Sequence, residues 1–128
     1  MTAGIAWQDP SSAILTDAEV SATSLSDLSS AVDLNGCVGL FSIGVQLTSN
    51  ASATVAPILR IYASHDGTNY TDEPVYERTL VLRTTSAIEQ LLPFPICSRY
   101  IKAAVYNGDG NTITSLTLYA HKNVLSTS

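Results

Sequence analysis

The chain has 128 residues and a mass of 13.5 kDa, a size that suits one domain and excludes two independent cores. An apolar fraction of 45% with only 13% charged residues excludes intrinsic disorder, which combines low hydrophobicity with high charge. The net charge of −5 opposes the phosphate contacts that dominate nucleic-acid binding, so no nucleic-acid partner is expected.

The acidic excess lies entirely in residues 1–59, which contain no Lys or Arg. This segment is either ordinarily solvated or complements a basic neighbour. Because no cation precedes Arg60, the positively charged start of a secretory signal is absent and we expect no export. The longest charge-free stretch, 34–59, is interrupted by polar residues. Its most apolar part, 36–45, is too short to cross a bilayer, so no membrane association is expected.

Residues 1–17 follow neither the helical nor the strand period and contain Gly4 and Pro10. We interpret them as an extended N-terminal arm with two apolar anchors, Ile5 and Trp7. Trp is among the residues most enriched as interface anchors. We therefore predict that Ile5, Trp7 and Pro10 bind a partner protein.

From residue 20 onward the apolar residues recur with the period of β-strands. Weak alternation over 20–24 and 31–34 leads into the turn residues Asn35-Gly36. Residues 40–48 alternate fully, which predicts a half-buried strand. The apolar side chains of this strand lie on one face and belong to Phe41, Ile43, Val45 and Leu47.

The middle of the chain predicts a hairpin. Strands are expected over 55–64 and 75–84, and Pro57 stands near the start of the first, where a missing donor is tolerated. The polar turn 65–69 between them contains Asp66-Gly67, a pair that readily supplies positive φ.

The C-terminal third predicts three further strands. Residues 87–92 form the first, which the sequence Pro93-Phe94-Pro95 is expected to end. Strands over 99–106 and 113–120 follow, separated by the glycine-rich turn 107–111.

Seven or eight short strands at spacings of about ten residues, with no long amphipathic helix, predict an all-β fold. We expect an antiparallel β-sandwich of the jelly-roll or immunoglobulin-like type over 18–128, preceded by the extended arm 1–17. The Cys-Trp-Cys spacing of a true immunoglobulin domain is absent.

The sequence offers little material for catalysis. His65 and His121 are each isolated from any recognisable motif, and a solvent-exposed or strand-end histidine is the simpler interpretation. Asp66, Asp72 and Glu73 could begin a calcium site, but their spacing fits no EF-hand loop and a turn explains Asp66 alone. We therefore expect no enzyme, no catalytic residues, no metal and no cofactor.

Cys37 and Cys97 match neither a zinc-ligand pair nor a redox motif. We interpret them as small buried hydrophobic residues, with a disulfide as the alternative. Most tyrosines fall within predicted strands, where packing on the sheet or at an interface is favoured over stacking on sugars.

Three segments resemble small β-sandwich virion proteins of tailed bacteriophages: the turn sequence of 64–72, the strand 99–107 and the last strand, 113–119. The resemblance covers residues 30–121 and does not include the arm. It implies a capsid decoration (cement) protein that binds the major capsid protein on the outside of the shell, often as a homotrimer. It also implies location in the virion after assembly in the host cytoplasm.

The alternative hypothesis is a carbohydrate-binding or host-adhesion module of a phage tail or fibre, because sandwiches also present sugar sites on loops and sheet faces. A small hydrolase is disfavoured, because the sequence lacks an acid-base constellation.

Overall fold

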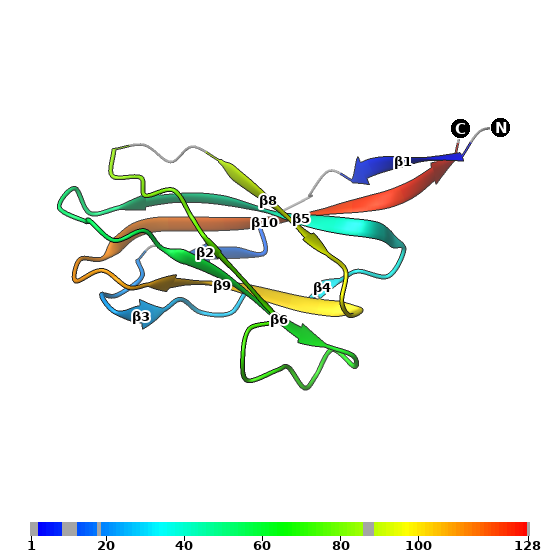
Figure 1. Ribbon diagram of the computed structural model, residues 1–128, viewed down its shortest axis with the longest axis horizontal. Helices are drawn as coiled ribbons and strands as arrows, with labels where there is room; N and C mark the ends of the chain where they lie inside the picture. The colour runs from blue at the N-terminus through cyan, green and yellow to red at the C-terminus, as the bar shows by residue number, and fades with distance from the viewer. Residues whose placement is uncertain (1–2, 9–12, 18, 86–88, 128) are drawn as a thin grey trace.

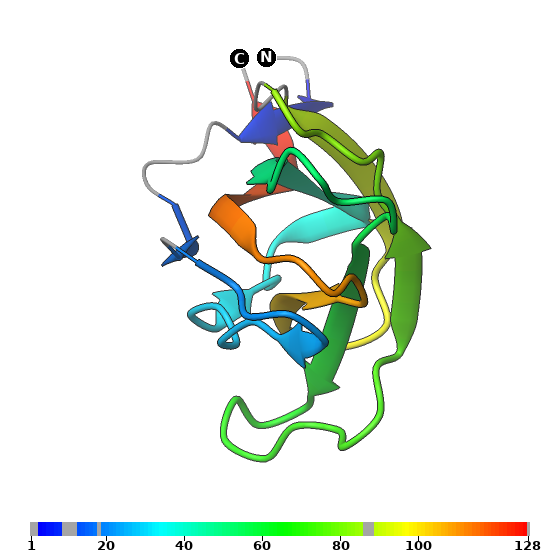
Figure 2. The same cartoon turned by 90° about the vertical axis from the view of Figure 1, so that its left-hand side faces the viewer.

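The computed structural model describes residues 3–8, 13–17, 19–85 and 89–127; in 3–8 and 124–127 it is the backbone that is described. This part of the chain is all-β, with no helix, and its strands form two antiparallel sheets (Figures 1 and 2). The strands are β1 (Ala3–Gln8), β2 (Leu15–Asp17), β3 (Ser24–Leu25), β4 (Val32–Asp33), β5 (Cys37–Ser49), β6 (Ile58–Ser64), β7 (Tyr76–Thr79), β8 (Gln90–Pro95), β9 (Tyr100–Asn107) and β10 (Ile113–Thr127).

The strand order identifies the type of sandwich. Sheet A has the order β1-β10-β5-β8, with β2 also on β10, and sheet B has the order β3-β9-β6-β7, with β4 also on β9. The strand pairs are therefore nested, as in one long hairpin folded over on itself. From the outside inward, β2 pairs with β10, β3 and β4 pair with β9, β5 pairs with β8, and β6 pairs with β7. This is the jelly-roll arrangement, so the expected all-β sandwich is confirmed in its jelly-roll form.

The core lies between the sheets, and β5 follows the predicted alternation. Phe41, Ile43, Val45 and Leu47 are all fully buried. Phe41 stacks on Phe94 of β8 with ring centroids 5.6 Å apart. On β9, the inward-pointing side chains of Ile101, Ala103 and Val105 are buried in the same way.

The start of β10 departs from its simple alternation. Leu116 and Leu118 point into the core, yet Ile113 on the opposite parity is also fully buried. The pairing of β10 with β5 shifts register between Ile113 and Ser115. Such a bulge re-aims the side chains before it, which turns Ile113 inward.

Several predicted strand boundaries are wrong. The last strand, predicted over 113–120, continues as β10 to Thr127. The sequence Pro93-Phe94-Pro95 does not follow a strand but forms the last three residues of β8, because β8 is an edge strand of sheet A and an edge tolerates the missing amide donors. The strand predicted over 75–84 ends as β7 at Thr79. The chain then leaves sheet B and crosses to β8 in sheet A.

The turn between β9 and β10 is fixed by a buried carboxylate. Asp109 Oδ2 accepts hydrogen bonds from the backbone N–H groups of Thr54 and Val55, both at 2.7 Å. Its Oδ1 accepts from the N–H of Asn111 at 2.8 Å. These donors favour the ionised form and hold the pKa of Asp109 well below its usual value of 3.8. The turn therefore anchors the segment between β5 and β6.

The expectation that both cysteines are buried is wrong. Cys37 is half-buried, Cys97 is exposed, and both are free thiols. The Cys37 thiol donates to the carbonyl of Leu40 at 3.2 Å. Cys97 follows the end of β8, in the connection to β9.

Candidate functional site

The residues predicted to bind a partner fall in or beside β1. Ile5 pairs with Leu125 and Trp7 with Asn123, both of β10, while Pro10 lies outside the described residues. The segment expected to be an arm is thus extended, but it is not separate from the sandwich. Residues 15–17 of that segment form β2, which pairs with β10 inside sheet A.

β1 pairs along its length with residues 122–127 of β10, and we call these two paired segments the terminal ribbon. Its register runs from Ala3 opposite Thr127 to Gln8 opposite Lys122. The last pair between β10 and β5 is Val124 with Cys37, so the ribbon continues beyond the sandwich (Figure 1). The described ends of the chain therefore lie together at its tip.

One edge of the terminal ribbon is open. Among the described residues, β1 has no strand partner other than β10. Beyond Val124 the described ribbon has only two strands, an arrangement that adds little stability in water, and its unpaired edge presents backbone donors and acceptors to another chain. Addition of a strand from a partner would both stabilise the ribbon and pair the free backbone donors and acceptors of β1.

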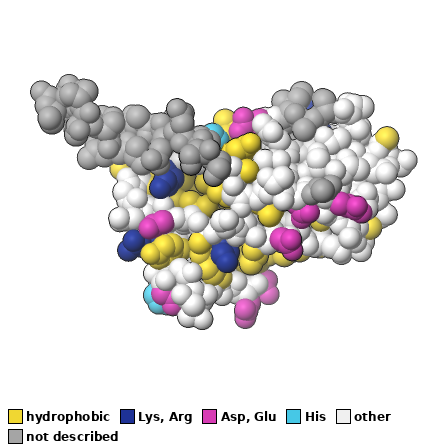
Figure 3. All heavy atoms as spheres, turned by 180° about the vertical axis from the view of Figure 1, so that it is seen from behind, with side chains coloured by type: hydrophobic (Ala, Val, Ile, Leu, Met, Phe, Trp, Pro, Cys, Tyr) yellow, Lys and Arg dark blue, Asp and Glu magenta, His cyan; other side chains and the backbone are white. Residues whose placement is uncertain are grey.

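Acidic side chains gather beside β2 and β3. Asp17, Glu19 and Asp27 line a shallow cavity of about 210 Å³. Within the described part of the chain none of the three forms a salt bridge. In Figure 3, Lys and Arg lie mainly on one side of the face, whereas Asp and Glu lie on both sides. The acidic excess of the N-terminal half is thus partly concentrated in one place.

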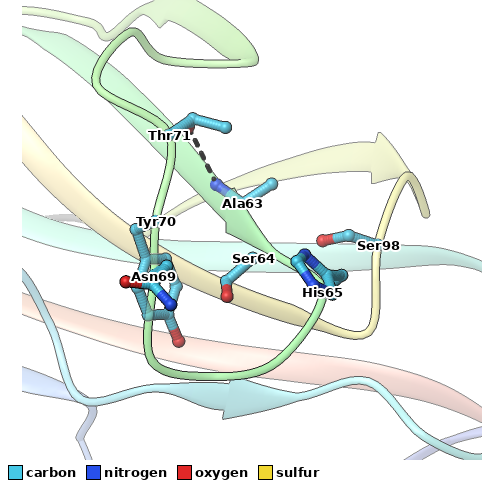
Figure 4. Close-up of a pocket in the computed structure, with 7 residues that line it drawn as sticks. All are labelled: Ala63, Ser64, His65, Asn69, Tyr70, Thr71 and Ser98. Atoms are coloured by element: carbon cyan, nitrogen blue, oxygen red, sulfur yellow. Dashed lines mark hydrogen bonds between the residues drawn. The ribbon is translucent and has the colours of Figure 1, made fainter.

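The loop between β6 and β7 forms a cavity of about 330 Å³ (Figure 4). Its lining residues carry hydroxyl, amide and imidazole groups, but the surface that they expose to the cavity is mainly apolar. The Ala63 N–H donates to Thr71 Oγ1 at 3.3 Å. The Tyr70 hydroxyl is buried and has no hydrogen-bond partner among the described residues. The lining residues are Ala63, Ser64, His65, Asn69, Tyr70, Thr71 and Ser98.

Asp66 organises this loop from within. Its carboxylate accepts from the N–H groups of Asn69 and Thr68 at 2.9 and 2.8 Å, and from the Ser64 hydroxyl at 2.9 Å. These bonds hold the pKa of Asp66 well below its usual value of 3.8. Gly67 has a φ of +78°, as the Asp-Gly pair predicts. Because loop donors occupy both oxygens of Asp66, the motif has a structural explanation.

The calcium alternative for this loop gains no support. Among the residues that the structure describes, no three His, Cys, Asp or Glu side chains lie where they could hold a metal ion. Asp72 and Glu73 are both exposed.

The outer face of sheet B carries tyrosines covered by cations. Tyr62 is buried in the sheet, as predicted for a strand tyrosine. Three further rings each lie beneath a cationic side chain, an arrangement that stabilises both groups. The pairs are Arg60 with Tyr106, Arg99 with Tyr100 and Lys102 with Tyr70, at 4.6, 5.0 and 4.8 Å.

The outer face of sheet A carries the polar constellation that the sequence did not reveal. His121 is not isolated, because its Nε2 lies 3.6 Å from Oε1 of Glu89. Gln46 and Tyr119 join them around a cavity of about 210 Å³. These residues come from three different strands or strand ends, so no local motif links them. The feature of the sequence that could have indicated this cluster is Gly44, because a glycine within a strand often marks a place where other groups approach the backbone closely.

Comparison with family models, curated proteins and solved structures finds no match to this chain. None of the described residues belongs to a helix that could span a bilayer. The class of the molecule is therefore defined by its own geometry, as an antiparallel jelly roll with a projecting terminal ribbon.

Proposed function

We propose that the chain is a non-enzymatic structural protein of a phage virion that decorates and stabilises the capsid by binding the major capsid protein. The observation that carries the proposal is the terminal ribbon, which extends beyond the sandwich and leaves one backbone edge of β1 open. A strand of the major capsid protein that pairs with this edge would tie the jelly roll to the shell.

Two further observations support a binding role. The acidic cavity lined by Asp17, Glu19 and Asp27 has no cationic partner among the described residues, and a basic surface of the shell would complement it. The resemblance of 64–72, 99–107 and 113–119 to small phage virion proteins is independent of the ribbon. A homotrimer is part of the proposal, and sedimentation equilibrium of the purified chain tests it.

The decisive experiment measures occupancy on capsids. Purified capsids that lack the chain are incubated with the full-length protein, with a variant lacking residues 2–12, or with Trp7→Ala. Cryo-electron microscopy then gives the position and copy number of the bound protein. We expect many symmetric copies for the full-length protein and a large loss of occupancy for both variants.

Val81→Ala provides the matched control, because Val81 is an exposed apolar residue in the crossing between the sheets. It should bind as the unchanged chain does. Full occupancy without residues 2–12 would refute the role of the ribbon. A single ring of copies at a neck or tail would refute capsid decoration.

A further inference from the structure

On the outer face of sheet A, Gly44 lies beneath Glu89 and His121, two of the residues that line the cavity. Gly44 pairs with Leu91 of β8 on one side and with Tyr119 of β10 on the other. Its neighbours Ile43 and Val45 are fully buried, so position 44 belongs to the opposite, outer face. The row of outward-pointing side chains that crosses β8, β5 and β10 therefore has no side chain on β5.

Two polar side chains lean over the vacant position. A Cβ atom placed on Gly44 would lie 2.5 Å from Glu89 Oε1 and 3.2 Å from His121 Nε2. Contacts this short exclude a larger residue unless Glu89 moves. Glycine at 44 thus permits a carboxylate from the start of β8 and an imidazole from β10 to meet above β5.

The polar atoms of this cluster are not fully satisfied. His121 Nε2 is buried and lacks a hydrogen-bond partner among the described residues, since its separation of 3.6 Å from Glu89 Oε1 exceeds hydrogen-bonding distance. A buried polar atom without a partner is unfavourable, and a bound ligand that supplies a hydroxyl group removes the penalty.

We propose that Gln46, Glu89, Tyr119 and His121 form a binding site for a neutral sugar residue. The Tyr119 ring offers an apolar surface for the C–H groups of a sugar ring. The Glu89 carboxylate accepts hydrogen bonds, Gln46 both donates and accepts, and the imidazole supplies one further group. Vicinal hydroxyls, which both donate and accept, match this set.

Size and charge narrow the ligand further. The cavity of about 210 Å³ is smaller than the ~300–1,000 Å³ typical of sites for drug-sized ligands, so it accommodates one sugar ring. The carboxylate disfavours anionic ligands. Among the described residues that line it, the cavity has one carboxylate, whereas glycoside hydrolysis ordinarily requires two, so the proposed role is binding of the sugar and not its cleavage.

A neighbouring position can contact a longer glycan. Thr117 on β10 shares the outer face with the cluster and pairs directly with Gln46 of β5. The terminal ribbon begins at Lys122, next to His121, but none of its residues is among the described residues that line the cavity, so the sugar site does not require the capsid-binding role.

An array of defined glycans probed with the full chain tests the proposal first. Titrations of the ¹⁵N-labelled chain with galactose, glucose, mannose and N-acetylglucosamine, followed by NMR, then locate the site. We expect saturable shifts at the backbone amides of Gly44, Gln46, Tyr119 and His121. Tetramethylammonium is titrated in parallel, because a carboxylate beside an aromatic ring also suits a cation.

Variants assign the site to its residues. Tyr119→Ala should weaken the affinity for the best sugar by about tenfold or more, and Glu89→Gln should weaken it severalfold. Tyr106→Ala on sheet B is the matched control and should bind as the unchanged chain does. Thermal unfolding followed by circular dichroism verifies that each variant is folded. Gly44→Ala is a separate test of access, in which binding is expected to be lost.

Three results would overturn the proposal. These are the absence of binding on both the array and in the titrations, unchanged affinity in folded Tyr119→Ala and Glu89→Gln, and saturable binding of tetramethylammonium without any sugar binding.

Discussion

Replacing Asn107 with Ala tests how the turn between β9 and β10 is held. The Asn107 side chain is almost fully buried, and its Nδ2 donates to the carbonyls of Ser21 and Asn111 at 3.2 and 2.8 Å. Its Oδ1 accepts from the N–H of Asp109 at 3.1 Å. Nδ2 also lies 3.3 Å from the Val20 carbonyl, which has a second donor in Ile113.

Truncation leaves three backbone groups without their partner, those of Ser21, Asn111 and Asp109. At about 1 kcal/mol for each lost hydrogen bond, the free energy of unfolding should fall by about 3 kcal/mol. Urea unfolding at 25 °C, followed by far-ultraviolet circular dichroism, measures the change. With an m-value of about 1.5 kcal/mol/M, the midpoint should fall by about 2 M while m stays constant.

Asn35→Ala is the control, because Asn35 is exposed in the turn before β5 and its side chain forms no hydrogen bond with described residues. It should change stability by less than about 0.5 kcal/mol. An Asn107→Ala protein that unfolds at the same urea concentration as Asn35→Ala would refute the reasoning.

Three further outcomes are expected. Stability should decline as the pH falls through about 4, because the folded-state pKa values of Asp66 and Asp109 lie below 3.8 and the unfolded chain therefore takes up more protons. The melting temperature of Asp109→Asn should depend less steeply on pH. An unchanged slope in this variant would contradict the explanation. Phe41→Ala should cost about 3–5 kcal/mol in urea unfolding, because a fully buried ring is removed; a loss under 1 kcal/mol would mean that the sheets repack. A thiol reagent should label two groups per native chain, Cys97 before Cys37, whereas a disulfide would leave none to label.

The candidate sites differ in how far sequence reasoning could reach them. The Asp66-Gly67 turn was recognisable because its hydrogen bonds join residues within three positions of one another. The pairing of Glu89 with His121 was not, because it joins β10 to the start of β8 across an intervening strand. No local pattern encodes which strands become neighbours.

The sequence by itself determined the period of the strands, the inward face of β5 and the all-β class, because these follow from alternation and turn chemistry within a few residues. Only the tertiary structure decided that the strands nest as a jelly roll, that a bulge turns Ile113 inward and that β8 includes two prolines. It also decided that β1 pairs with the end of β10. Each of these depends on hydrogen bonds and packing between segments far apart in the chain.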